Sequence, residues 1–150
     1  MHNLIPITPL GGRGAQSQEF EGLTISEMPD FAYASIAMRL GKKISFRRAA
    51  KKAMEILPPA PGESAAVKVG EGLLTIFWIG VDQWIVEAPY AAHADLAAHL
   101  HNILKDNASV TEQSDGWARF DLKGEGCFAV LERLSMVDIA KMHAGATTRT

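Results

Sequence analysis

Three of the five histidines fall within nine consecutive positions, and clustered histidines are a common mark of metal binding. His93, His99 and His101 lie in or beside a segment with helical periodicity. On a helix, His99 and His101 point about 200° apart, because each residue advances by about 100°. No histidine, aspartate or glutamate stands three or four positions after His93. The spacing therefore predicts solvated or flanking histidines, and His143 has no visible partner in its own segment.

Three carboxylates close together in the sequence, Glu112, Asp115 and Asp121, are candidates for acid–base catalysis. Nothing in the sequence fixes their separation, and surface turns commonly carry the same residue types. The serines offer no nucleophile, because none lies in the Gly-x-Ser-x-Gly context of a nucleophile elbow. The serines considered are Ser17, Ser26, Ser35, Ser45, Ser64, Ser109, Ser114 and Ser135.

The turn Gly124–Gly126 lies between a predicted strand and a predicted helix, where a phosphate-binding loop would lie. A dinucleotide fingerprint needs a third glycine, and Phe128 and Ala129 occupy the two positions where it would fall. Glu125 would repel a phosphate from the helix N-terminus. No histidine is placed to activate Cys127, which is interpreted as a small buried thiol. We therefore predict tight-turn packing here, and no catalytic, cofactor-binding or metal-binding residue in this chain.

The elements on either side of this turn are well marked. From Trp117 to Leu122, apolar and mixed positions alternate, as in a half-buried strand. From Cys127 to Leu134, apolar residues recur at helical spacing. We expect this strand, turn and helix to anchor a sheet-and-helix core.

Upstream segments supply the remaining elements, each ended by glycine or proline. Leu73–Ile79 is apolar on both faces, so we expect it inside the sheet. Val110–Leu122 is predicted as a strand pair or bulged strand with its turn at Ser114–Gly116. The other predicted strands are Tyr33–Leu40 and Trp84–Ala88, and the other predicted helices are Ser45–Leu57 and Ala92–Lys105. This order predicts an α+β fold with a ferredoxin-like β-α-β-β-α-β core and one added helix.

Residues 1–30 hold three of the seven prolines and little apolar density, so we expect an extended N-terminal arm. Residues 31–150 are predicted to form a single α+β domain with a loop at Ala60–Gly72. Thr147–Thr150 resembles the opening of a further strand, so we expect this domain to be incomplete at its C-terminus or completed by a strand from a partner.

Composition indicates a soluble protein of a reducing compartment, and we expect it in the cytoplasm. The single cysteine excludes an internal disulfide. No secretory signal is visible, and no apolar run approaches the ~20 residues that a membrane span needs. A pI of about 6.2 argues against nucleic acid as a partner, and so does the lack of aromatics among the bases, except for Phe46, which falls on the apolar face.

Charge is unevenly distributed along the chain. Seven of the 15 basic residues lie within fourteen positions that contain no acid. They are Arg39, Lys42, Lys43, Arg47, Arg48, Lys51 and Lys52. The rest of the chain carries eight bases against 17 acids. This asymmetry indicates a contact with an acidic surface on another protein, or else a solvated helix face.

A succession of short motifs resembles the gamma subunit of heterotetrameric sarcosine oxidase from about Tyr33 to Thr150. The hairpin Phe77-Trp78-Ile79-Gly80 with Asp82-Gln83-Trp84 is the most specific of them. The others are Met38–Gly41, Ile56–Pro58, Val110–Gly116 and Phe120–Leu134. Val81 replaces a proline usual in that family, and Lys123–Gly126 replaces its Ser-Gly-Pro turn.

The resemblance implies a fold akin to part of the folate-binding domain of the glycine-cleavage T-protein. It also implies a bacterial complex with alpha, beta and delta subunits that demethylates sarcosine to glycine and passes the one-carbon unit to tetrahydrofolate. FAD, FMN, NAD and zinc would belong to the other subunits, and this chain would be non-catalytic. Two alternatives stay open: the equivalent subunit of an enzyme for another N-methyl amino acid, and a free-standing folate-type binding domain.

Overall fold

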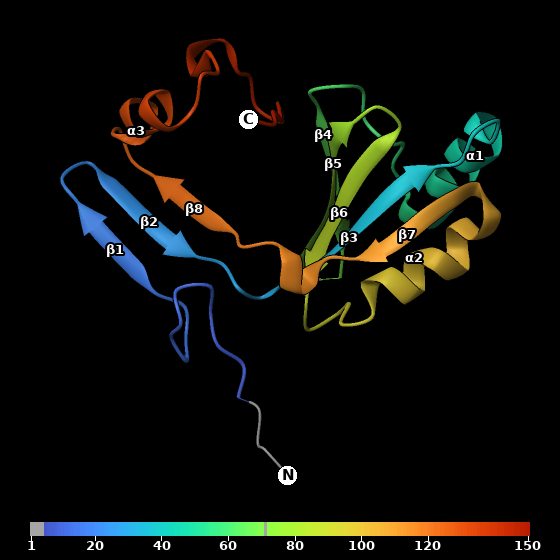
Figure 1. The fold of residues 1–150 in the computed structure, drawn as a ribbon, viewed down its shortest axis with the longest axis horizontal. Helices are drawn as coiled ribbons and strands as arrows, with labels where there is room; N and C mark the ends of the chain where they lie inside the picture. Colours follow the sequence, from blue (N-terminus) through green and yellow to red (C-terminus); the bar gives the residue numbers. More distant parts are fainter. Residues whose placement is uncertain (1–4, 71) are drawn as a thin grey trace. The chain divides into compact units, whose positions relative to one another are not determined.

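The computed structural model describes residues 5–70 and 72–150, and contacts within the chain divide it into two compact units (Figure 1). Unit 1 combines the chain up to Pro29 with Asp115–Met142 and Thr150. Unit 2 combines Asp30–Ser114 with His143–Arg149. The sequence predicted one domain after residue 30. It did not indicate that Asp115–Met142 and His143–Arg149 would belong to different units.

Unit 2 contains a five-stranded sheet in the order β4-β5-β6-β3-β7, in which every neighbouring pair is antiparallel. Two helices cover one face of this sheet (Figure 1). The strands are β3 (Phe31–Met38), β4 (Ser64–Val69), β5 (Gly72–Gly80), β6 (Gln83–Pro89) and β7 (Ala108–Glu112), and the helices are α1 (Lys43–Met54) and α2 (Leu96–Leu104).

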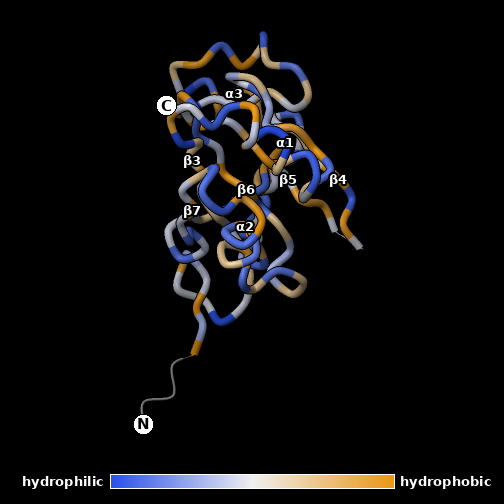
Figure 2. The backbone as a smooth tube through the Cα atoms, turned by 90° about the vertical axis from the view of Figure 1, so that its right-hand side faces the viewer, coloured by the Kyte–Doolittle hydropathy of each residue, from blue (hydrophilic) through white to orange (hydrophobic). Residues whose placement is uncertain are grey.

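The core of unit 2 lies between this sheet and the two helices. In α2, Leu96, Leu100 and Leu104 recur every four residues and are all fully buried. Phe46 and Ala50 do the same in α1. Hydrophobic stretches in β5 and β6 supply the facing residues (Figure 2). One side of each helix is therefore apolar because it meets the sheet.

The α+β class predicted from the sequence is confirmed, with a correction to the element order. Ala60–Gly72, predicted as a loop, contains the edge strand β4, which pairs with β5 from Ser64 to Val69. Its alternating Ala65, Val67 and Val69 are short and lie beside glycines, so the strand pattern was weak. Leu73–Ile79 corresponds to β5, an inner strand as predicted.

Unit 1 contains a three-stranded antiparallel sheet in the order β1-β2-β8, together with one short helix. Its elements are β1 (Ser17–Phe20), β2 (Leu23–Glu27), β8 (Phe120–Lys123) and α3 (Cys127–Leu134). Part of the predicted arm is therefore a hairpin, whose turn at Gly22 adopts a positive φ of 75°. Met1–Leu4 of that arm lie outside the described residues.

The expectation that the strand, turn and helix around Gly124–Gly126 anchor the core was wrong. Helix α3 runs from Cys127 to Leu134 as predicted, but none of its residues is buried. The reason is size: an eight-residue helix and three strands of four or five residues enclose little apolar area. Val110–Leu122, predicted as a strand pair or bulged strand, contains two strands with a 3-10 turn at Ser114–Gly116 as predicted, but β7 and β8 belong to different sheets and do not pair with each other.

Candidate functional site

The histidines have different surroundings. His99 and His101 are exposed on α2, and the His99 ring lies 6.1 Å from that of His93, centroid to centroid. Within residues 5–70 and 72–150, no group of three or more histidine, cysteine, aspartate or glutamate side chains is arranged to hold a metal ion. These histidines therefore give no basis for proposing a metal centre.

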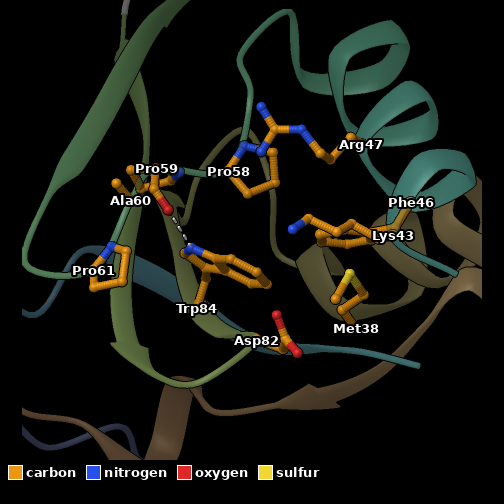
Figure 3. A pocket seen from close by; sticks show the side chains of 10 residues that line it. All are labelled: Met38, Lys43, Phe46, Arg47, Pro58, Pro59, Ala60, Pro61, Asp82 and Trp84. Atoms are coloured by element: carbon orange, nitrogen blue, oxygen red, sulfur yellow. Dashed lines mark hydrogen bonds between the residues drawn. The ribbon is translucent and has the colours of Figure 1, made fainter. Parts of the chain in front are cut away.

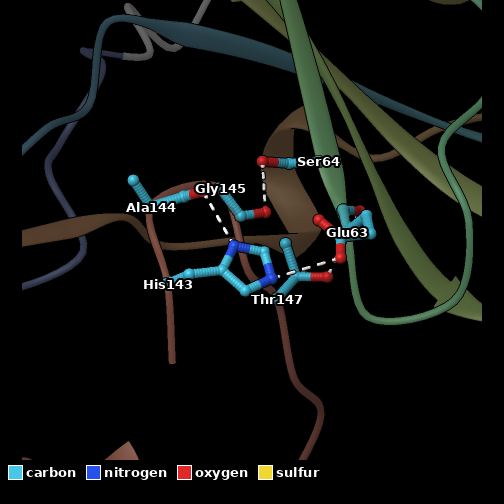
Figure 4. A network of polar contacts seen from close by, with 6 residues as sticks. All are labelled: Glu63, Ser64, His143, Ala144, Gly145 and Thr147. Atoms are coloured by element: carbon cyan, nitrogen blue, oxygen red, sulfur yellow. Dashed lines mark hydrogen bonds and ion pairs between the residues drawn. The ribbon is translucent and has the colours of Figure 1, made fainter. Parts of the chain in front are cut away.

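His143 has a partner that its own segment did not reveal (Figure 4). Its Nε2 lies 3.3 Å from Oε1 of Glu63, and its Nδ1 donates to the carbonyl of Ala144 at 3.0 Å. The Ala144 carbonyl, and then the negative charge of Glu63, raise the pKa of the imidazole. Hydrogen bonds from the backbone of Ser64 and Thr147 attach this segment to the start of β4. The cluster therefore joins two distant segments of unit 2.

Each of the three candidate carboxylates lies in a surface setting. Glu112 accepts hydrogen bonds from Gln113 and from both the backbone and hydroxyl of Ser114. Partial burial raises the pKa of Glu112, but these hydrogen bonds outweigh it and the net pKa is lowered. Asp121 pairs with Nε of Arg119 at 3.0 Å, and Asp115 is exposed in the 3-10 turn. Glu112 and Asp121 thus support local structure.

The glycine turn agrees with the tight-turn interpretation. The backbone N–H of Gly126 donates to the carbonyl of Gly22 at 2.8 Å. Gly124 has a φ of 118°, and a Cβ at this position would lie 2.3 Å from the same carbonyl oxygen. Gly124 is therefore needed for the close approach of two backbones in unit 1, while a Cβ at Gly126 would lie 3.2 Å from the same oxygen. Cys127 is half-buried at the start of α3.

Glu27, which the sequence did not single out, is a buried carboxylate in unit 1 and only 3% exposed. Its two oxygens accept hydrogen bonds from the backbone N–H groups of Leu10 and Gln16, each at 2.8 Å. Burial raises the pKa of Glu27, but these bonds and one from the Thr8 hydroxyl outweigh it, so the pKa is lowered. Glu27 therefore holds the loop between Thr8 and Gln16 against β2.

Unit 2 has a pocket of about 280 Å³ beside the start of α1 (Figure 3). Trp84 lies at its floor, where the indole Nε1–H donates to the carbonyl of Pro59 at 3.0 Å and the ring stacks on Phe46. Lys43 and Arg47 extend over the pocket from α1, and Asp82 lies on the opposite side. The remaining lining residues are Met38, Pro58, Pro59, Ala60 and Pro61.

The cluster of bases predicted from the sequence is exposed along α1. We call its six members on or next to this helix the basic face of α1. They are Lys42, Lys43, Arg47, Arg48, Lys51 and Lys52. Among the described residues, none of the six forms an ion pair with a carboxylate, while Nζ of Lys51 donates to the carbonyl of Glu55. The neighbouring base Arg39 pairs with Asp106 at 3.6 Å.

Comparison with known proteins finds a likeness in fold. No family model matches the chain, and no curated protein matches it. One solved structure with a similar fold is a chain of the heterotetrameric sarcosine oxidase from Corynebacterium sp. U-96, solved in complex with pyrrole 2-carboxylate. The TM-score is 0.63 and the sequence identity 22%, over 78% of this chain. The likeness is one of fold. This chain spans 57% of the length of that one.

No helix in residues 5–70 and 72–150 is both long enough and apolar enough to cross a membrane.

Proposed function

We propose that this protein is a non-catalytic subunit of a heterotetrameric sarcosine oxidase, equivalent to the gamma subunit. Its partners would be alpha, beta and delta subunits in the bacterial cytoplasm. That complex would demethylate sarcosine to glycine and pass the one-carbon unit to tetrahydrofolate. FAD, FMN, NAD and zinc would be held by the other subunits.

The observation that carries the proposal is the fold likeness to one chain of such a heterotetramer, over 78% of this chain. The motifs Phe77–Gly80 and Asp82–Trp84, which resemble those of the gamma family, lie in the β5–β6 hairpin and support the gamma assignment. We also assign the arrangement of β5, β6, β3 and β7 with two helices on one face to the ferredoxin-like class, as in part of the T-protein folate-binding domain.

A second observation favours a subunit over a free-standing binding domain. Large apolar side chains are exposed throughout unit 1, and exposed apolar surface is a mark of interaction sites when it is contiguous. They include Ile5, Ile7, Leu10, Phe20, Trp117, Phe120, Phe128, Leu134 and Met136. Covering such residues with other subunits would remove apolar area from water at about 25 cal/mol per Å².

The test is purification of the tagged full-length chain from its own host, with mass measurement of whatever accompanies it. We expect three other chains in equal stoichiometry and a flavin-coloured complex that produces peroxide from sarcosine. The isolated chain should be colourless and inactive. A chain that purifies alone contradicts the proposal in favour of the free-standing binder, and so does stoichiometric flavin on the isolated chain. A complex that oxidises N-methylglutamate but not sarcosine would keep the subunit role and change the substrate.

A further inference from the structure

Three of the six cations on the basic face of α1 form one row beside the pocket. Lys43, Arg47 and Lys51 are four residues apart and therefore lie on the same side of the helix. Lys51 is engaged with a backbone carbonyl, but Lys43 and Arg47 have no carboxylate partner among the described residues and line the pocket itself. Two exposed charges without a carboxylate partner among the described residues thus stand at the rim of a hollow whose lining is part polar and part apolar.

The hollow is small and rigid. Its volume of about 280 Å³ lies just below the roughly 300–1,000 Å³ usual for small-molecule sites. Three proline rings form one wall, and proline fixes its own backbone torsion. The floor is held in place by the hydrogen bond from Trp84 to Pro59 and by the stacking of Trp84 on Phe46. A cavity of this size suits one apolar side chain better than a whole cofactor.

The surroundings of the pocket favour a protein partner over nucleic acid. Single-stranded nucleic acid is bound by aromatic faces that are open to stacking between the bases. Here Phe46 is fully buried and Trp84 is 8% exposed, so neither ring presents an open face among the cations. The cations continue past the pocket along α1, which matches a chain of several anionic groups rather than one small acid.

We propose that the basic face of α1 and this pocket form one docking surface for an acidic segment of a partner protein. An apolar side chain of that segment fills the pocket, and its flanking carboxylates pair with Lys43 and Arg47. Aromatic residues are enriched as such anchors in interface cores. The carboxylates accelerate encounter and fix the register, while the anchor slows dissociation. This surface lies within unit 2 and does not depend on the proposed function.

The experiment uses the full-length chain and a synthetic peptide with one phenylalanine flanked on each side by two glutamates. Binding is followed by the indole N–H signal of Trp84 in NMR spectra, one of three tryptophan signals, assigned with a Trp84→Phe variant. We expect a saturable shift of this signal. Affinity should fall about fivefold when glycine replaces the phenylalanine, and more when glutamine replaces the glutamates or when salt is raised.

Two variants and one matched control locate the contact. Arg47→Glu should weaken binding at least about fivefold, whereas Lys68→Glu, the same charge reversal on the exposed edge strand β4, should not. Ala60→Phe narrows the pocket without a change of charge, so it should abolish the advantage of phenylalanine over glycine and keep the salt dependence. If Arg47→Glu folds poorly, Ala60→Phe still tests whether the peptide occupies the pocket.

Several outcomes would overturn the proposal. If the peptide with glycine in place of phenylalanine binds as tightly as the original, the pocket does not bind an apolar anchor. If the peptide with glutamine in place of glutamate binds as tightly, the carboxylates do not contribute to binding. Phenylacetate alone, if it saturates the Trp84 shift at the same concentration, would make the pocket a small-molecule site. An oligothymidylate that binds more tightly than the peptide would assign the basic face to nucleic acid. Equal losses of peptide affinity in Arg47→Glu and Lys68→Glu would mean that binding depends on the net charge of the protein and not on the basic face of α1.

Discussion

Units 1 and 2 have similar kinds of secondary structure but very different interiors. In unit 2, a five-stranded sheet and two helices bury a continuous cluster that includes Ile36, Phe46, Ile76 and Leu100. In the described part of unit 1, the buried residues are Thr8, Leu23 and Glu27, two of which are polar. Helix α3 buries none of its residues, whereas α2 buries three. Unit 2 is therefore stabilised by a core, and unit 1 by hydrogen bonds and turns.

This difference shows which part of the chain has the weaker apolar core. Burial of apolar surface is the dominant favourable term in folding, and a small sheet without it is marginal in water. Unit 1 keeps its large apolar side chains exposed, as described above. We therefore expect unit 1 to be the part that partners stabilise, and the isolated chain to self-associate at high concentration.

The largest expected effect comes from matched leucine truncations in the two units. Leu100→Ala in α2 removes a fully buried side chain and should lower the free energy of unfolding by about 2–5 kcal/mol. Leu134→Ala in α3 removes a side chain that is 75% exposed and should change it by less than about 0.5 kcal/mol. Urea denaturation followed by circular dichroism measures both. Equal costs would mean that unit 1 has a core after all.

A smaller effect is expected from alanine at two glycines with positive φ. Gly124→Ala in unit 1 places a Cβ 2.3 Å from the carbonyl oxygen of Gly22, whereas Gly70→Ala in unit 2 meets open space. Both variants carry the backbone strain of a left-handed residue, but only Gly124→Ala also separates two backbones, at a further cost of about 1–3 kcal/mol. NMR signals of β2 and β8 should shift in Gly124→Ala alone. Unchanged spectra would refute the close approach.

The smallest effect is a pH dependence confined to unit 1. The folded-state pKa of Glu27 is lowered, so its contribution to stability is present above the unfolded pKa, near 4.5, and is lost as pH falls through the folded value. Glu27→Gln should therefore loosen the Thr8–Gln16 loop at neutral pH. In acid, where Glu27 is protonated, the loop should be equally loose in the variant and in the native chain. The amide signals of Leu10 and Gln16 report this. Glu21→Gln, an exposed control in the same hairpin, should leave them unchanged.

Much of unit 2 could be predicted from the sequence because its patterns reflect burial. The leucines of α2 and the stripe at Phe46 and Ala50 have helical spacing because they face one sheet. The predicted start of the second helix at Ala92 was early, since residues 92–95 form turns before Leu96. Short turns and fraying ends carry no periodic signal.

Unit 1, the His143–Glu63 pair and the pocket could not be predicted from local sequence patterns, because they arise from contacts between residues far apart in the sequence. Glu27 accepts hydrogen bonds from the backbone of Leu10 and Gln16, and His143 pairs with a carboxylate 80 positions earlier. The pocket joins α1 to a proline segment and to Trp84, and the sequence does not indicate that these converge. What the sequence did indicate is the basic face itself, since its charge density is local.

Hydrogen exchange of the isolated full-length chain tests the central claim, that unit 2 is self-sufficient and unit 1 is not. The backbone amides of β3, β5 and β6 should exchange by global unfolding only, because each of these strands is hydrogen-bonded to a neighbouring strand on both sides. Amides of β2, β8 and α3 should exchange at least about a hundredfold faster, through opening that leaves unit 2 folded. Equal protection of the two units in the isolated chain would contradict the account.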